Sequence, residues 1–168
     1  MNHILLTGMS ATGKSAIVRE LITRGYRAVD LDTPEWSEWV NVDSADVLTP
    51  AEGKDWVWRE DRVRALLSED HNDILFISGC AENMENLYPL IDKIILLSTP
   101  LELVMQRLKA RSSDSYGSTD AERNKISELV ATVEPMLRQA AHHEIDTSGP
   151  LKVTVDEILK LASEPMAS

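Results

Sequence analysis

The stretch Gly8-Met-Ser-Ala-Thr-Gly-Lys-Ser15 decides the fold of this chain, because it fits the pattern G-x-x-x-x-G-K-S in full. Residues 3–7 before it have the composition of a short buried strand, and residues 14–24 after it have the apolar spacing of a helix. Such a strand, loop and helix direct backbone N–H groups and the positive end of the helix toward phosphate oxygens. The sequence therefore predicts a nucleoside triphosphate site.

The side chains of Lys14 and Ser15 suit a triphosphate that is bound with Mg²⁺. A lysine in this place reaches the β- and γ-phosphates, and the serine hydroxyl can join the Mg²⁺ shell. ATP is favoured over GTP, because the sequence has no Asn-Lys-x-Asp run of the kind that usually reads guanine. The residues of this loop expected to bind the nucleotide are Gly8, Ser10, Ala11, Thr12, Gly13, Lys14, Ser15 and Ala16.

Beyond the loop, strand and helix patterns alternate, which predicts an α/β fold with a parallel sheet. The expected strands cover residues 3–7, 27–30, 73–78, 93–98 and 143–146, and the expected helices cover 14–24, 55–68, 100–111, 120–141 and 153–162. Two stretches interrupt the alternation. Residues 33–54 show no clear strand pattern, and residues 112–119 are small and polar, as in a loop.

Length and charge limit the classes of protein to consider. A chain of 168 residues suits a single domain, 1–168. The net charge of −11 argues against a nucleic-acid or anionic-membrane binder, since those need a basic surface. With Cys80 as the one cysteine and no apolar run long enough for a signal or membrane segment, we expect a cytoplasmic protein. We also expect it to be monomeric or weakly dimeric.

The acidic side chains are concentrated between Asp30 and Asp73, where 13 acidic and 4 basic residues give a net charge of −9. All four tryptophans lie in the same segment. The spacing of Trp36 and Trp39 is consistent with one face of a short helix. Two interpretations stay open: the tryptophans pack a small subdomain onto the sheet, or they form an aromatic platform for a sugar, ring or cation.

With these features the sequence resembles the small P-loop kinases, the group of shikimate kinase, gluconate kinase and the nucleoside monophosphate kinases. The resemblance implies a three-layer P-loop sandwich with strand order 2-3-1-4-5, a lid near residues 107–124 and an acceptor-binding segment near 33–68. It implies that Arg107 stacks on adenine and that Arg111 approaches the transferring phosphate as a catalytic group. Ser148 and Gly149 correspond to the family's adenine loop.

Asp30-Leu-Asp32 stands where shikimate-kinase-like enzymes carry a D-x-D motif. The resemblance implies that Asp30 holds Mg²⁺ through water and that Asp32 contacts the acceptor hydroxyl as a catalytic base. Carboxylates at a strand end beside the phosphate loop suit both roles, so Ser15, Asp30 and Asp32 are the expected metal-site residues. The alternative for both aspartates is an ordinary turn before Pro34.

The acceptor side departs from the shikimate kinase pattern. Ser78-Gly79-Cys80 has one glycine where that family has a run of them, and Arg62 stands where the F-R-x-x-E pattern beginning at Trp58-Arg59 would have its glutamate. We still expect Arg59, Gly79, Cys80 and Asp32 to line the acceptor site. Cys80 is interpreted as a small packing residue near the pocket and not as a nucleophile, because no histidine is evident that would pair with it.

The resemblance predicts an ATP-dependent kinase that phosphorylates a small-molecule hydroxyl, with ATP and Mg²⁺ as cofactors. Three alternatives stay open: a nucleoside monophosphate kinase, a shikimate kinase, and a regulatory P-loop protein with a protein partner. The acidic charge of the acceptor segment favours a neutral or cationic acceptor over a strongly anionic one.

Overall fold

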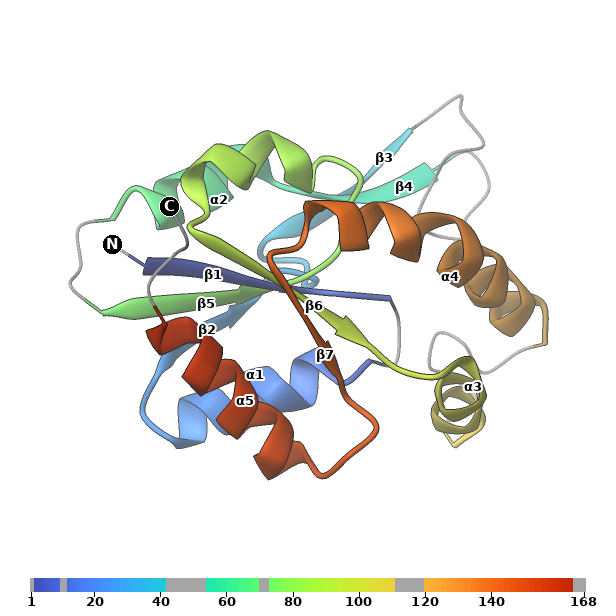
Figure 1. Ribbon diagram of the computed structural model, residues 1–168. Helices are drawn as coiled ribbons and strands as arrows, with labels where there is room; N and C mark the ends of the chain where they lie inside the picture. The colour runs from blue at the N-terminus through green and yellow to red at the C-terminus, as the bar shows by residue number, and fades with distance from the viewer. Residues whose placement is uncertain (1, 10–11, 42–53, 70–72, 111–119, 165–168) are drawn as a thin grey trace.

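The computed structural model of this protein describes residues 2–9, 12–41, 54–69, 73–110 and 120–164. Five parallel strands lie in the order β2-β5-β1-β6-β7 (Figure 1). Their bounds are β1 Asn2–Thr7, β2 Arg27–Asp30, β5 Ile74–Ser78, β6 Lys93–Ser98 and β7 His143–Asp146. Counted among the parallel strands alone, this is the order 2-3-1-4-5, so the predicted three-layer P-loop fold is confirmed.

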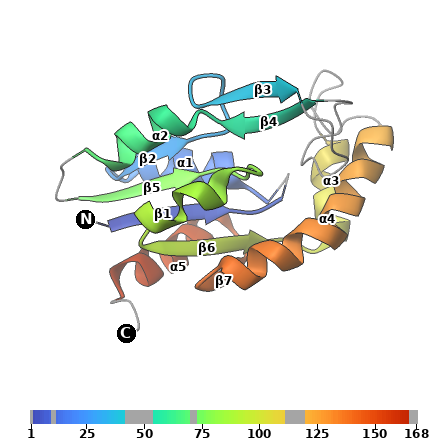
Figure 2. The ribbon, with the colours of Figure 1, turned by 90° about the horizontal axis from the view of Figure 1, so that it is seen from above.

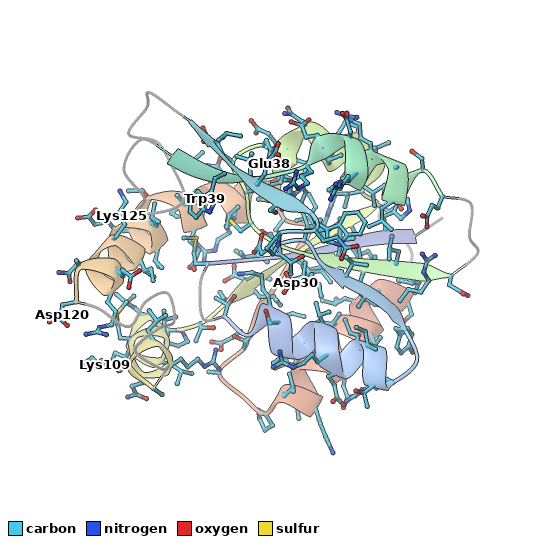
Figure 3. The ribbon with its side chains drawn as sticks, turned by 180° about the vertical axis from the view of Figure 1, so that it is seen from behind. Asp30, Glu38, Trp39, Lys109, Asp120 and Lys125 are labelled. Atoms are coloured by element: carbon cyan, nitrogen blue, oxygen red, sulfur yellow. The ribbon has the colours of Figure 1, made fainter. Side chains whose placement is uncertain are left out.

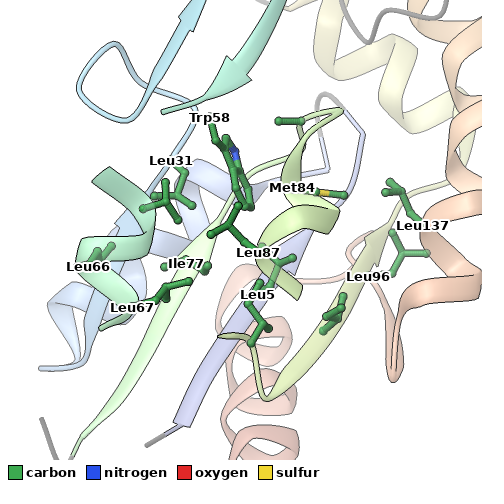
Figure 4. Packing of buried hydrophobic residues seen from close by; sticks show 14 of the residues in the cluster. Leu5, Leu31, Trp58, Leu66, Leu67, Ile77, Met84, Leu87, Leu96 and Leu137 are labelled. Carbon is green, nitrogen blue, oxygen red and sulfur yellow. The ribbon is translucent and has the colours of Figure 1, made fainter. Parts of the chain in front are cut away.

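Helices cover both faces of the sheet, as Figure 1 shows. One face carries α1 and α5, and the other carries α2, the 3-10 helix η1 and α4. Alternate residues of β1 separate the two cores: Leu5 packs with the α2 side (Figure 4), while Ile4 and Leu6 pack with the α1 side. The helices are α1 Lys14–Thr23, α2 Glu60–Leu67, η1 Met84–Leu90, α3 Leu101–Lys109, α4 Asp120–Ala140 and α5 Leu151–Ser163.

A hairpin of two antiparallel strands, β3 Ser37–Asn41 and β4 Lys54–Trp58, stands where the sequence predicted no strand. The predicted helix over 55–68 was therefore wrong at its start, because its first residues belong to β4 and α2 begins only at Glu60. The helical interpretation of the tryptophan spacing was also wrong. Trp39 lies within β3, opposite Trp56 in β4, since tryptophan and valine favour paired strands.

Helix α3 and the beginning of α4 lie beyond the carboxyl ends of the central strands, where Figure 2 shows the two helices side by side. They meet through Val104 and Leu108 of α3 and Ile126 of α4. The predicted lid, 107–124, begins in α3 and ends in α4, and its residues 111–119 lie outside the described residues. None of the helices in the described ranges is long and apolar enough to cross a membrane.

Candidate nucleotide and acceptor site

The phosphate loop connects β1 to α1 and depends on glycine at two positions. A Cβ on Gly8 would lie 2.4 Å from the carbonyl oxygen of Leu97 in the neighbouring strand, so no side chain fits there. Gly13 precedes α1 with φ of 93°, a left-handed conformation that favours glycine. The Thr12 hydroxyl donates to the Met9 carbonyl at 2.8 Å and closes the turn. The first N–H groups of α1 thereby face the predicted phosphate position.

The Lys14 ammonium lies over this loop. Its Nζ donates to the carbonyl oxygens of Gly8 at 2.6 Å and Met9 at 2.9 Å. These contacts hold a positive charge at the mouth of the loop, where a triphosphate would place its β- and γ-oxygens. The geometry therefore agrees with the role that the sequence predicts for Lys14.

Ser15 and Asp30 come together at the end of β2. The Ser15 hydroxyl donates to Asp30 Oδ2 at 3.1 Å, and the other oxygen of Asp30 accepts the backbone N–H of Asp32 at 3.0 Å. Figure 3 views the molecule from behind, with Asp30 close to α1. A serine hydroxyl and one carboxylate suit Mg²⁺, which keeps several waters and takes its remaining oxygens from phosphates. The described residues contain no group of three or more His, Cys, Asp and Glu that could hold a metal by themselves.

Asp32 lies two residues further along, on the side of the sheet edge that faces Gly79 and Cys80. The backbone N–H of Cys80 donates to Asp32 Oδ1 at a long 3.4 Å. Burial raises the pKa of Asp32 to about 6, the nearby Lys14 charge opposes that rise, and Asp30 adds to it. A carboxylate with a pKa near 6 is ionised at pH 7 and basic enough to accept a proton.

A pocket of about 500 Å³ opens beside the loop and joins the residues described so far. Its lining consists of Thr12, Gly13, Lys14, Ser15, Ala16, Ile17, Asp32, Arg107, Thr147, Gly149, Leu151 and Thr154. The phosphate-loop residues and Asp32 thus share one pocket with residues from the ends of α3 and β7. The volume is within the usual range of small-ligand pockets.

Arg107 crosses the far end of this pocket from α3. Its guanidinium donates to the Thr147 carbonyl at 2.8 Å and approaches the Thr99 hydroxyl at 3.5 Å. The planar guanidinium is thereby fixed in the pocket that Gly149 also lines, and the resemblance assigns both residues to adenine. Ser148 is not part of the pocket lining, and its backbone N–H donates to Asp146 Oδ1 at 2.7 Å.

The predicted acceptor residues do not all meet. Gly79 and Cys80 adjoin Asp32, whereas Arg59 is engaged in the hairpin region, where it donates to Glu38 Oε2 at 2.9 Å and the Pro34 carbonyl at 3.2 Å. Figure 3 shows Glu38 on the hairpin, away from Asp30. Ser10, Ala11 and Arg111 lie outside the described residues, so their predicted roles stay predictions.

Sequence reasoning missed part of the pocket wall and one polar group near Asp32. Thr147, Leu151 and Thr154 line the pocket. The only sequence signal near them was the predicted strand-to-helix turn at Ser148 and Gly149. The indole N–H of Trp58 is buried close to Gly79. The sequence indicated that the tryptophans are packing residues or an aromatic platform. It gave no indication that the N–H of one indole lies near Gly79 and Asp32.

Comparisons with known proteins agree with this fold. The structure resembles shikimate kinase from Acinetobacter baumannii in complex with shikimate, with TM-score 0.62 and 19% identity over 96% of this chain and 92% of that one. A gluconokinase from Sinorhizobium meliloti 1021 gives TM-score 0.59 and 16% identity over 96% and 91%. A sugar kinase from Janibacter sp. HTCC2649 gives TM-score 0.55 and 16% identity over 95% and 93%.

At such identities these likenesses show the fold, and they confirm the resemblance to the small P-loop kinases at that level. No curated protein matches the chain. A family model described as AAA domain matches residues 4–130, which is more than half of the sequence and runs from β1 into α4. The chain belongs to this AAA domain family.

Proposed function

We propose that this protein is an ATP-dependent phosphotransferase that transfers the γ-phosphoryl group of ATP to the hydroxyl of a small molecule. One observation carries the proposal: a single pocket is lined both by the phosphate loop with Lys14 and by the Asp32 carboxylate. A phosphate loop and a carboxylate thus line the same pocket, an arrangement that would suit transfer of a phosphoryl group to a hydroxyl. The kinase names of the structural neighbours support the same reaction class.

At the phosphate end, the backbone N–H groups of the loop and Lys14 would bind the β- and γ-phosphates. Ser15 would ligate Mg²⁺ directly and Asp30 through water, in keeping with the hydrogen bond between them. Mg²⁺, when bound, neutralises charge on the phosphate oxygens. A direct bond from Asp32 to the metal stays a prediction, since Asp32 Oδ1 faces the Cys80 N–H.

At the acceptor end, Asp32 would orient the hydroxyl and take its proton as the oxygen attacks the γ-phosphorus. The leaving group is ADP, and the proton passes from the hydroxyl to the Asp32 carboxylate. Arg107 would hold the adenine end of the nucleotide. Arg111, with the rest of the predicted lid 107–124, would approach the γ-phosphate and exclude from the active site the water that would hydrolyse ATP.

The chemical class of the acceptor is inferred from the acidic charge of residues 30–73 and from the three arginines in that segment, which could otherwise bind an anionic acceptor. Within the described residues, Arg59 is bonded to Glu38, Arg62 to the Glu35 carbonyl and Arg64 to the Asn86 carbonyl. An acceptor with a phosphate or carboxylate would have to displace these partners. This favours a neutral or cationic acceptor and weighs against the two alternatives with anionic acceptors, a nucleoside monophosphate kinase and a shikimate kinase.

The experiment is a coupled ADP-release screen over nucleoside monophosphates, shikimate, sugars, sugar acids and aminoglycosides. We expect a neutral or cationic hydroxyl compound to raise ADP release well above basal hydrolysis, and Lys14→Ala to abolish the increase. A nucleoside monophosphate that accelerates turnover would establish the first alternative. Tight ATP binding with no stimulation by any acceptor, and a stable complex with another protein, would establish the regulatory alternative.

A further inference from the structure

The last residue of β4, Trp58, is held rigidly within the core. Its indole ring packs in the same apolar cluster as Leu31 and Met84 (Figure 4), and only 1% of the residue is exposed. Its backbone N–H donates to Asn83 Oδ1 at 3.0 Å, and its carbonyl accepts from Asn83 Nδ2 at 2.9 Å. Because both the ring and the backbone are fixed, the indole N–H cannot turn toward solvent.

This indole N–H has an unmet hydrogen-bonding requirement. Among the described residues, no atom accepts a hydrogen bond from Trp58 Nε1 in normal geometry, although the atom is buried. Buried donors are nearly always paired, because an unpaired one has lost its bond to water without a replacement. The donor therefore needs an acceptor close to where it points.

The candidate acceptor is Asp32 Oδ1, which borders Gly79, the residue directly after β5. A Cβ at residue 79 would lie 3.0 Å from Trp58 Nε1 and 3.0 Å from Asp32 Oδ1. The two atoms therefore border the same narrow gap, which exists because residue 79 has no side chain. The indole is also close enough to Asp32 to favour the ionised carboxylate.

We propose that Trp58 is a positioning residue whose Nε1–H donates to Asp32 Oδ1 across the gap at Gly79. The inference rests on the role proposed above for Asp32. Together with the Cys80 N–H, the indole would fix Oδ1 through both of its lone pairs and leave Oδ2 for the acceptor hydroxyl. A phenylalanine at position 58 would fill much of the same space and remove only the donor.

The first test observes the indole N–H directly, in ¹H–¹⁵N spectra of the full chain, where Trp58→Phe identifies the resonance by its disappearance. In Asp32→Asn, which removes the charged acceptor, the Trp58 indole proton should move upfield as its hydrogen bond weakens. The Trp39 indole, which lies on the exposed side of the hairpin, should keep its position and serves as the control. An unmoved Trp58 resonance in Asp32→Asn would overturn the proposal.

The second test is a double-mutant cycle on equilibrium unfolding. The stability lost through Trp58→Phe should be smaller in an Asp32→Asn background than in the wild type, because the shared hydrogen bond can be lost only once. Trp39→Phe combined with Asp32→Asn should instead be additive. Additive effects of Trp58→Phe and Asp32→Asn would also overturn the proposal. If Trp58→Phe does not fold, single substitutions to phenylalanine at Trp36, Trp39 and Trp56 assign the Trp58 resonance by elimination, and the Asp32→Asn spectrum still decides.

Neither test requires an acceptor or turnover, so their failure is distinct from failure of the proposed function, which would show as absence of phosphotransfer. Once an acceptor is known, Trp58→Phe should lower kcat about tenfold and leave the KM for ATP unchanged, since the indole acts on Asp32 and not on the nucleotide. A normal kcat in that variant would contradict the positioning role.

Discussion

The Ser15 hydroxyl donates a hydrogen bond to Oδ2 of Asp30 at 3.1 Å, which joins the first turn of α1 to the end of β2. The two residues meet because β2 pairs in parallel with β5, with Asp30 opposite Ser78, at the same sheet edge as the phosphate loop. A hydroxyl and a carboxylate thus stand side by side at the place where a loop-bound triphosphate would carry its Mg²⁺.

Asp30→Asn should lower the apparent affinity for Mg²⁺ in turnover and preserve the fold. The amide keeps the size of the side chain but removes the negative charge that would hold a metal-bound water, so the Mg²⁺ concentration at half-maximal activity should rise about tenfold. Titration of ATP turnover with Mg²⁺ measures the effect. Asp61→Asn, at an exposed carboxylate of α2, is the matched control. An unchanged Mg²⁺ dependence would remove Asp30 from the metal site.

Asp32→Asn should stabilise the protein at neutral pH. The folded-state pKa of Asp32 is about 6, above its usual 3.8, so between these values the folded state binds more protons than the unfolded state. Stability contributed by this group is therefore lost as the pH rises from about 4 to about 6. At pH 7.5 the amide should add about 1–2 kcal/mol to the free energy of unfolding, with no gain at pH 3.5.

Denaturant unfolding of Asp32→Asn and wild type at the two pH values measures this difference. A variant that is less stable than the wild type at pH 7.5 would contradict the raised pKa.

Ionisation of Asp32 should also make turnover depend on pH. Activity should rise as the pH increases through about 6, and Asp32→Asn should lack this rise.

Arg107→Ala should affect the nucleotide more than the chemical step. The guanidinium lines the pocket that we propose holds ATP and is held by the Thr147 carbonyl, so its loss should remove a contact surface that is present both before and during the reaction. The KM for ATP should rise about tenfold while kcat changes little. Arg138→Ala, at an arginine bonded to Glu134 and Glu144 outside the pocket, is the control. A selective loss of kcat in Arg107→Ala would assign it to the transferring phosphate instead.

Gly79→Ala should impair turnover strongly and stability mildly. The added methyl would lie 3.0 Å from both Asp32 Oδ1 and Trp58 Nε1, so the carboxylate must shift. Gly8→Ala offers the contrast, because its methyl meets the Leu97 carbonyl at 2.4 Å and the backbone itself must move. Thermal unfolding should therefore show a much larger loss for Gly8→Ala, of about 2–4 kcal/mol, than for Gly79→Ala. Equal losses would show that position 79 is as constrained as position 8.

The sequence was most informative where local pattern and tertiary context agree. The apolar runs within 73–78 and 93–98 predicted buried parallel strands, which are β5 and β6, and the glycines of the phosphate loop predicted the turn between β1 and α1. The hairpin was missed because β3 and β4 stabilise each other by pairing, although residues 42–53 separate the two strands in the sequence. That cross-strand contact is absent from any local window.

The site was predictable at its phosphate end and much less so at its acceptor end. Lys14 and Ser15 follow from the phosphate-loop motif, and Asp30 and Asp32 follow from the resemblance, which implies a D-x-D motif at the end of this strand. The pairing of Arg59 with Glu38 depends on where the unforeseen hairpin lies, so a basic residue expected at the acceptor is bonded elsewhere. The buried N–H of Trp58 depends on how β4 packs against η1, which no spacing in the sequence reveals.

Transfer of a phosphoryl group from ATP to a separate hydroxyl compound, dependent on Asp32, is the central claim. Its most direct measurement follows γ-labelled ATP in the presence of the acceptor that the screen selects, and compares labelled acceptor with ADP formed. We predict nearly one phosphorylated acceptor for each ADP in the wild type, and a loss of about 100-fold in Asp32→Asn with ATP affinity retained. ADP accompanied only by free phosphate with every acceptor, or undiminished transfer in Asp32→Asn, would contradict it.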